Sequence, residues 1–445
     1  MSVPGNSEGL FPASELLLGS TRFDLIPKLF YVKYGLASTE PLSFASELYL
    51  AHIRVFNGFR ESKPRKNGPD DFLRAFSALF ESVRDDGFDP SSRIPLNPDR
   101  NLENGAHRVA TAYFFGLEVP TTVAQRDDAH RWTYAWFLKS GLDRNWADFI
   151  ALERVRLSSD ARVVLVHGAV ASDLDEEIRD TLLRFGAVFY ASELDLDADE
   201  YEHLVHESYS GEEWLEHPTK GQGRAREYVS KAYGLGHVRV YVLIGMDDDS
   251  AIAAKAAVRE LVGRRHHVIH IPDSHEQNIQ LASALFSPTT REFFADLRPA
   301  QGSALIDQLR QLDDALAAVG VSRSEVCVTG SSVMDALGIR KGRDLDVLHL
   351  GRVCDALKQN GVGCHCSESE WYGSSEWELV NDPRQHFYFR GFKFAHPEVV
   401  RAMKAARRER PKDLRDVRLL RAWRMRSRLR NARRTVGRAF RNTFR

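Results

Sequence analysis

The sequence has few cysteines and no hydrophobic run long enough to span a membrane. Its 445 residues include only 4 cysteines, and the pair Cys364 and Cys366 has no second pair that would complete a zinc site. No segment approaches the roughly 18 consecutive apolar residues of a transmembrane helix, and Met1–Ser20 lacks the basic start and apolar core of a secretory signal. These absences predict a cytoplasmic protein with reduced thiols.

Two further absences narrow the possible functions. The sequence contains no GxxxxGK[ST] motif, so no P-loop is predicted, and it has neither tandem repeats nor long low-complexity segments. Hydrophobic residues make up 43% and charged residues 28%, which is typical of globular proteins. A chain of this length is expected to form roughly two to four domains.

The end of the chain has little acidic charge. From Arg401 to Arg445 there are 18 lysines and arginines against 3 acidic residues, or +15 in a protein whose total is −1, and no acid follows Asp416. Apolar residues recur in this segment every three or four positions, which predicts a helix with one apolar stripe framed by arginines. The stripe consists of Ala422, Met425, Leu429, Ala432, Val436 and Phe440.

We therefore expect residues 417–445 to form a basic amphipathic tail. A helix of this kind binds the surface of an anionic membrane, which would place the protein on the inner face of the membrane. Nucleic acid, whose phosphates need only cations, is a less favoured partner. A solvated tail without a partner is the third interpretation.

The most specific pattern is a Gly-Ser turn followed by an Asp-Leu-Asp sequence. Val326–Thr329 is expected as a strand, and Gly330 with Ser331 as the turn into a short helix, where a phosphate can approach the backbone. Asp344 and Asp346 are expected on the next strand, where alternation places both on one face. Two carboxylates on one face form a hard-oxygen site that suits magnesium with a bound nucleotide triphosphate.

This pattern resembles that of the polymerase-beta-like nucleotidyltransferases, in which Gly-Gly or Gly-Ser precedes Asp-hydrophobic-Asp/Glu by roughly nine to thirteen residues. The resemblance implies a domain at 301–416 that binds two Mg²⁺ ions and uses a nucleotide triphosphate as substrate. It also implies a third carboxylate, for which Glu378 is the best match and Glu376 and Asp382 are alternatives. Lys412 lies in a segment similar to the helix after many such cores and is a candidate nucleotide contact. If the resemblance is coincidental, the paired aspartates are ordinary solvated residues.

A second block, 21–125, contains a candidate anion site. We expect a strand over 23–35 and, further on, a helix that opens with Gly105, His107 and Arg108. Glycine permits close approach of an anion, the first backbone amides of the helix point outward, and the basic side chains can contact a phosphate or nucleotide. The alternative is that the two basic side chains only pack at the helix start.

This second block resembles the ParB and sulfiredoxin-like fold, most closely its free-serine-kinase branch. In that branch a Gly-His-His-Arg motif follows an Asp, whereas this chain has Asn104 and Ala106 at the corresponding positions. The resemblance therefore implies phosphate binding more directly than kinase activity.

The middle of the chain, 148–299, alternates predicted strands and helices. Such alternation favours an α/β domain with a mainly parallel sheet, and its pattern identifies no chemistry. Its clustered histidines, from His266 to His275, are interpreted as core and surface residues.

Together these patterns predict a multidomain α/β protein. The order of its blocks resembles a poorly characterised group of bacterial proteins, and this resemblance implies an association with surface-polysaccharide genes. The expected function is a cytoplasmic, Mg²⁺-dependent transfer of a nucleoside monophosphate from a nucleotide triphosphate to a small-molecule or glycan-precursor acceptor. In a bifunctional version of this expectation, the first domain is also a kinase. The alternatives are a protein-modifying or antitoxin-like nucleotidyltransferase and a non-catalytic, ParB-like nucleotide-gated DNA-binding protein.

Overall fold

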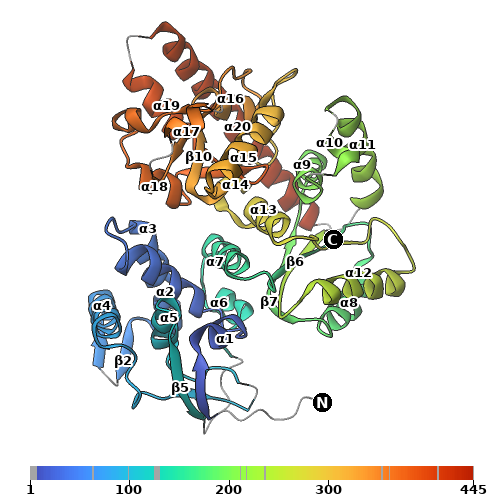
Figure 1. Cartoon of the computed structure of the whole chain (residues 1–445). Helices are drawn as coiled ribbons and strands as arrows, with labels where there is room; N and C mark the ends of the chain where they lie inside the picture. The colour runs from blue at the N-terminus through green and yellow to red at the C-terminus, as the bar shows by residue number, and fades with distance from the viewer. Residues whose placement is uncertain are drawn as a thin grey trace. The chain divides into compact units, whose positions relative to one another are not determined.

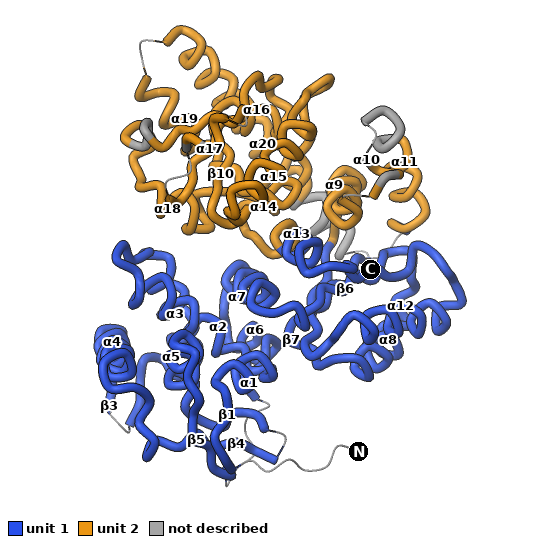
Figure 2. The backbone as a smooth tube through the Cα atoms, in the orientation of Figure 1, with its two compact units in different colours: residues 1–194, 234–282 blue, residues 195–233, 283–445 orange. Residues whose placement is uncertain are grey.

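The chain folds into two compact units, each with helices and small sheets. Unit 1 comprises residues 1–194 and 234–282, and unit 2 comprises 195–233 and 283–445 (Figure 2). This computed structural model describes residues 8–62, 65–98, 100–124, 131–210, 212–216, 218–234, 237–351, 354–359, 361–407 and 410–443. It gives the backbone alone for 213, 216, 218–222, 354, 356, 367–369 and 435–443. The mixed α/β class expected from the sequence is confirmed.

The first part of unit 1 packs helices against a three-stranded sheet of order β1-β5-β4 (Figure 1). Strand β5 is antiparallel to β1 and parallel to β4. Helix α2 packs on both α3 and α5. The elements are β1 (Gly9–Pro12), α1 (Ala13–Leu18), α2 (Leu25–Tyr31), the π-helix η1 (Val32–Leu36), α3 (Ser43–Asn57), β2 (Arg60–Ser62), β3 (Arg65–Asn67), α4 (Pro69–Asp86), β4 (Ile94–Leu96), α5 (Ala106–Phe114), β5 (Glu118–Val123), α6 (Tyr134–Lys139) and α7 (Arg144–Leu157).

The strand predicted over 23–35 is wrong, because this segment forms α2 and η1. All seven residues of α2 are buried and all except Lys28 are apolar or aromatic, so its sequence is close to that of a buried strand. Pro27 lies in the first turn of the helix, where a missing N–H group removes no hydrogen bond. Periodicity alone could not separate these two structures.

The second part of unit 1 is built on a four-stranded sheet of order β7-β8-β6-β9. The core lies between this sheet and the helices α8 and α12. The elements are β6 (Arg162–Val166), the 3₁₀ helix η3 (Ser172–Leu174), α8 (Asp175–Leu182), β7 (Ala187–Leu194), β8 (Val238–Ile244), α12 (Asp248–Val262), β9 (Ile269–His270) and α13 (His275–Phe286), whose last residues belong to unit 2.

The mainly parallel sheet predicted for 148–299 is wrong, because every neighbouring pair in this sheet is antiparallel. β6 and β7 do run in the same direction on either side of α8, as the alternating pattern suggested. However, β8 lies between them and is antiparallel to both. Strand order depends on contacts between distant segments, and alternation along the sequence does not specify it.

Unit 2 contains a five-stranded mixed sheet of order β12-β11-β10-β14-β13, with β10 at its centre (Figure 1). β10 is antiparallel to β11 and parallel to β14. The elements are α9 (Ala198–Ser208), α10 (Glu213–Glu216), α11 (Pro218–Ala232), α14 (Pro288–Phe293), α15 (Leu305–Val319), η4 (Arg323–Glu325), β10 (Val326–Thr329), α16 (Ser331–Ala336), β11 (Asp346–His349), α17 (Cys354–Gln359), β12 (Gly363–Cys364), η5 (Cys366–Trp371), α18 (Glu376–Asn381), β13 (His386–Phe389), β14 (Phe392–Ala395), α19 (Pro397–Ala406) and α20 (Pro411–Thr443).

The basic end of the chain is the continuation of α20, a helix of 33 residues. One face of α20 packs on unit 2 through the buried side chains of Leu420 and Trp423. On the same face the hydroxyl of Ser427 donates to Asp296 Oδ2 at 2.7 Å, and Arg424 forms an ion pair of 2.7 Å with Glu292. Among the described residues no helix is both long and apolar enough to cross a membrane.

The docking of α20 gives a prediction about stability. Trp423→Ala should lower the free energy of unfolding of unit 2 by about 3–5 kcal/mol, because it empties a large buried site. Met425→Ala, two residues further on the exposed face, should change it by less than about 0.5 kcal/mol. Urea unfolding followed by circular dichroism measures both. Equal effects of the two substitutions would show that α20 does not dock by this face.

Candidate functional site

The predicted strand, turn and helix around Gly330 are present. β10 is completely buried, and its antiparallel pairing with β11 places Thr329 opposite Asp346. Gly330 follows with φ 68° and ψ −133°, a conformation that favours glycine. A β-carbon at this position would lie 2.8 Å from Asp346 Oδ2. The glycine therefore makes room for the Asp346 carboxylate at the end of the central strand.

The two aspartates lie close together, although only one of them is in the strand. β11 begins at Asp346, and Asp344 precedes it, so the expectation that both lie in the strand is wrong. Their exposure still alternates as expected, because Asp344 is exposed and Leu345 is buried. Burial raises the pKa of Asp346, and the charge of Asp344 raises it further. Two carboxylates that repel each other in this way are suited to share a cation.

The loop that carries Asp344 is held by buried polar groups. The Ser332 hydroxyl donates to the Asp344 carbonyl at 3.0 Å. The buried Asp335 carboxylate accepts hydrogen bonds at 2.7–3.0 Å from the backbone nitrogens of Ala300 and Gly342 and from the hydroxyl of Ser303. Asp335 is therefore a structural anchor, which fixes the path of the chain between α16 and Asp344.

The structure brings His365, which no motif in the sequence marks, beside Asp346. β12 pairs with β11 in parallel, and His365 follows β12 directly. Its Nε2 lies 3.4 Å from Asp346 Oδ2, and its Nδ1 lies 2.9 Å from the hydroxyl of Tyr372. That hydroxyl is in turn 3.0 Å from Thr329 Oγ1. No spacing rule could have identified His365, because its place depends on the pairing of β12 with β11.

The charge of the imidazole is set by its surroundings. Burial, followed by the positive charge of Arg407 and other basic residues, lowers the pKa of His365 to about 4. At neutral pH the ring is therefore uncharged and offers a lone pair to its neighbours.

Basic residues surround these groups. Lys404, Arg407 and Lys412 each lower the pKa of Asp346, so Lys412 lies within electrostatic range, as a nucleotide contact requires. Lys404 is buried and bonded to Asp413 at 3.1 Å and Asp416 at 2.9 Å. Lys404 therefore stabilises the start of α20. Lys412, in contrast, is exposed to solvent.

The predicted third carboxylate, Glu378, lies in helix α18. Its backbone nitrogen donates to Ser375 Oγ at 3.1 Å, as part of the helix cap. Among the interactions of the described residues none joins Glu378 to Asp344 or Asp346. The structure therefore adds His365 as a candidate for the role that the resemblance implied for Glu378.

One cluster of histidine and cysteine side chains lies beside β12. His349, Cys364 and Cys366 have potential ligand atoms within 4.8 Å of one another. Cys364, however, is in a disulfide, so it cannot act as a thiolate ligand and the expectation of reduced thiols is wrong for it. Cys327 and Cys366 are free thiols.

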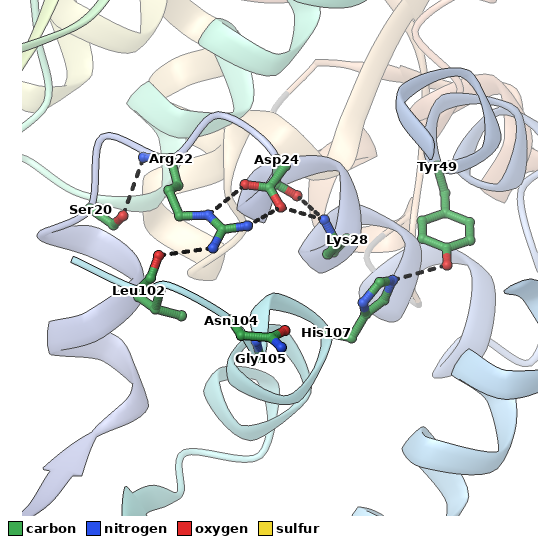
Figure 3. Close-up of polar contacts among 9 residues, drawn as sticks. All are labelled: Ser20, Arg22, Asp24, Lys28, Tyr49, Leu102, Asn104, Gly105 and His107. Atoms are coloured by element: carbon green, nitrogen blue, oxygen red, sulfur yellow. Dashed lines mark hydrogen bonds and ion pairs between the residues drawn. The ribbon is translucent and has the colours of Figure 1, made fainter. Parts of the chain in front are cut away.

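In unit 1 the helix predicted after Gly105 is present as α5. Gly105 is left-handed, with φ 88°, and its nitrogen donates to Asn104 Oδ1 at 2.7 Å. His107 Nε2 lies 3.0 Å from the Tyr49 hydroxyl (Figure 3). Arg108 donates to the hydroxyl and carbonyl of Ser92, at 2.6 and 3.1 Å. Arg108 therefore holds the segment before β4, which leaves it less suited to bind an anion than the sequence suggested.

A buried ionic group lies near α5 and was also missed. Asp24 is fully buried and forms two hydrogen bonds with Arg22, at 2.9 and 2.8 Å, and an ion pair of 2.6 Å with Lys28 (Figure 3). Burial opposes ionisation of Asp24, but the charges of Arg22 and Lys28 outweigh it and hold its pKa well below the usual range. Arg22 also donates to the Leu102 carbonyl at 2.9 Å, which ties the group to the segment that leads into α5.

Two histidines complete this region. Burial lowers the pKa of His52 far below its ordinary value, and the charge of Lys28 lowers it further. The same two causes act in the same order on His107. His52 is completely buried, and hydrogen bonds with the backbone of Tyr49 and Leu48 act against the lowering of its pKa.

The comparisons with known proteins do not identify the chain. No protein-family model, no curated protein and no solved structure matches it.

The geometry around Asp346 gives a prediction. Gly330→Ala should displace the Asp346 carboxylate, since the new methyl group would meet it at 2.8 Å in a backbone conformation that alanine rarely adopts. We expect the affinity for Mn²⁺, used as a magnesium analogue, to fall at least about 10-fold, as measured by electron paramagnetic resonance. Gly223→Ala, where a β-carbon meets open space, is the control. Unchanged Mn²⁺ affinity in Gly330→Ala would contradict the packing described.

Proposed function

We propose that unit 2 is a magnesium-dependent nucleotidyltransferase. The observation that carries the proposal is the placement of Asp346 at the start of β11, beside the glycine turn of β10 and within range of Asp344. The exposed Lys412 supports it, because a cation near the carboxylates suits a triphosphate.

The residues present fit magnesium rather than zinc. The donor set is made of carboxylate oxygens from Asp344 and Asp346, which hard cations prefer. Asp344 is exposed and Asp346 is partly exposed, so both can reach an ion that arrives with its substrate. Glu378 would complete an all-oxygen ligand set, and His365, whose Nε2 lies 3.4 Å from Asp346 Oδ2, would orient that carboxylate. Magnesium, when bound, would neutralise charge on the triphosphate.

Backbone and side-chain groups of the protein would position the triphosphate. Gly330 allows a phosphate to approach the backbone, and the hydroxyl of Ser331 at the start of α16 is available as a donor. Lys412 would pair with the outer phosphates. The oxygen of an acceptor hydroxyl would form a bond to the α-phosphorus and release its proton to a carboxylate of the site, such as Glu378, or to water, while the bond from that phosphorus to the bridging oxygen breaks and pyrophosphate leaves.

The acceptor of the nucleoside monophosphate belongs to one of two classes of molecule. A small molecule or glycan precursor is the first choice, and a protein side chain is the alternative. The ParB-like interpretation of 21–125 adds a possible kinase that would supply a phosphorylated acceptor. Because Arg108 donates to Ser92, it is less suited to contact that phosphate than the sequence suggested.

The aspartates provide the principal test. Asp344→Asn or Asp346→Asn should lower pyrophosphate release from labelled nucleotide triphosphates, supplied with a metabolite extract, at least about 100-fold, because each removes a charge that holds the metal. Asp314→Asn, an exposed carboxylate on α15, should retain full activity. Undiminished release in both aspartate variants would disprove the assignment.

A second comparison decides the third ligand. If His365 acts at the metal, His365→Phe should weaken Mn²⁺ binding and activity together, whereas Glu378→Gln should leave both near the parent values. The opposite pattern would restore Glu378 to the role implied by the resemblance. Equal retention by both variants would leave the aspartates as the complete protein ligand set.

We also propose that the outward face of α20 binds an anionic membrane surface. Met425 is 68% exposed and Leu429 58% exposed, on the face opposite the one that docks. The 3.6-residue period of the helix places three arginines on the same face as Met425 and Leu429, namely Arg418, Arg421 and Arg428. None of the three forms an ion pair among the described residues. Val436 and Phe440, the last members of the predicted stripe, lie outside the described side chains.

The membrane proposal predicts a specific loss of binding. Met425→Ser combined with Leu429→Ser should weaken cosedimentation with phosphatidylserine vesicles at least about 10-fold, because each apolar side chain contributes roughly 1.5–3 kcal/mol when fully buried. Ile252→Ser, another exposed apolar residue, is the control. DNA binding that is unaffected by the double substitution but falls steeply with salt would favour nucleic acid instead.

A further inference from the structure

One histidine and two cysteines from adjacent strands of unit 2 converge beside β12. His349 is the last residue of β11 and is completely buried. Cys364 ends β12, Cys366 begins η5, and both side chains are partly buried. The parallel pairing of β11 with β12 brings these segments side by side, although α17 separates them in the sequence.

The potential ligand atoms of the three side chains have the spacing that a zinc ion needs. His349 Nε2 lies 3.6 Å from Cys364 Sγ, and these two atoms and Cys366 Sγ all lie within 4.8 Å of one another. A tetrahedral zinc ion with Zn–S bonds of about 2.3 Å and a Zn–N bond of about 2.0 Å holds sulfur and nitrogen roughly 3.5 Å apart, and two sulfurs roughly 3.8 Å apart. Small movements of the side chains would therefore bring all three atoms within bonding distance of one ion.

The types of ligand favour zinc over magnesium. Thiolates and imidazole are ligands that zinc prefers, whereas magnesium takes oxygen ligands. Two thiolates balance the charge of Zn²⁺ and a neutral imidazole adds none, so the occupied site carries no net charge, which suits a partly buried position. The imidazole binds through the lone pair of Nε2, with the ring proton on Nδ1.

Reduction must precede binding, because Cys364 is in a disulfide in this structure. A dithiol reductant supplies two electrons and two protons, so that the S–S bond breaks, Cys364 and its partner sulfur become thiols, and the reductant becomes a disulfide. Zn²⁺ then displaces the thiol protons of Cys364 and Cys366 to solvent and forms bonds to both sulfurs and to His349 Nε2. The fourth tetrahedral position is open to the sulfur released from the disulfide or to water.

We propose that His349, Cys364 and Cys366 bind a zinc ion when the disulfide of Cys364 is reduced. Its metal and its ligands differ from those of the carboxylate site, so this proposal does not depend on the nucleotidyltransferase assignment. Cys364 and Cys366 flank His365, whose Nε2 lies 3.4 Å from Asp346 Oδ2. Bound zinc would therefore fix the segment that carries His365, and re-formation of the disulfide would release the ion.

Substitution with Co²⁺ on the full-length protein tests the site. The protein is reduced with a phosphine, and excess Mg²⁺ is added to occupy the carboxylate site. The reduced protein should bind Co²⁺ with sulfur-to-cobalt charge-transfer absorption, and Zn²⁺ should abolish this absorption. The oxidised protein should bind at least about 100-fold more weakly, because Cys364 then offers no thiolate. Absence of the absorption from the reduced protein, or equal affinity in the two states, would overturn the proposal.

A pair of cysteine variants locates the ligands. Cys366→Ser should lower the affinity of the reduced protein for Co²⁺ at least about 100-fold, because it removes one thiolate. Cys327→Ala, which removes the other free thiol, is the control and should leave the affinity unchanged. Unchanged affinity in Cys366→Ser, or an equal loss in both variants, would contradict the assignment of Cys366.

Alkylation keeps the test decisive if Cys366→Ser does not fold. Equimolar Zn²⁺ should protect Cys364 and Cys366 of the reduced parent protein from iodoacetamide, as measured by mass spectrometry of the digested protein. Equal alkylation of these two cysteines with and without zinc would show that they do not bind the ion, and the proposal would fail.

Discussion

The antiparallel pairing of β10 with β11 is the constraint on which the candidate site of unit 2 depends. It sets Thr329 opposite Asp346 and so places a glycine turn beside a carboxylate. The carboxylate needs the space that Gly330 leaves, and the strand needs β12 on its other side to bring His365 into contact. A shift of one residue in this register would turn Asp346 to the opposite face and separate these groups.

Features that depend on a few neighbouring residues could be predicted from the sequence, whereas features that depend on contacts between distant segments could not. The turn at Gly330 and the helix start at Gly105 were predicted correctly, because a glycine and its flanking apolar segment act over a few residues. The sheet of 148–299 was predicted with the wrong strand direction, since β8, which follows the unit 2 segment 195–233 in the chain, lies between β6 and β7. Such an insertion leaves no signal in the alternation of strands and helices.

The missed site residues have the same cause. Asp24 and Lys28 are four residues apart, a spacing that places them together only on a helix, and the segment was expected to be a strand. His365 reaches Asp346 across a parallel pair of strands. In both cases the secondary or tertiary structure determines which side chains are neighbours. When one element is predicted wrongly, or its pairing is unknown, these neighbours cannot be identified.

The two faces of α20 also constrain what the basic end of the chain can do. Arg424 pairs with Glu292, and Arg434 pairs with Asp197 at 2.6 Å, so part of the arginine charge is used to dock the helix on unit 2. Docking leaves Met425 and Leu429 exposed in a fixed direction. A helix held in this way does not need to fold when it meets a surface, so it loses less conformational entropy on binding than a disordered basic tail would. The acidic residues of unit 2 thus orient the exposed face as well as stabilise the fold.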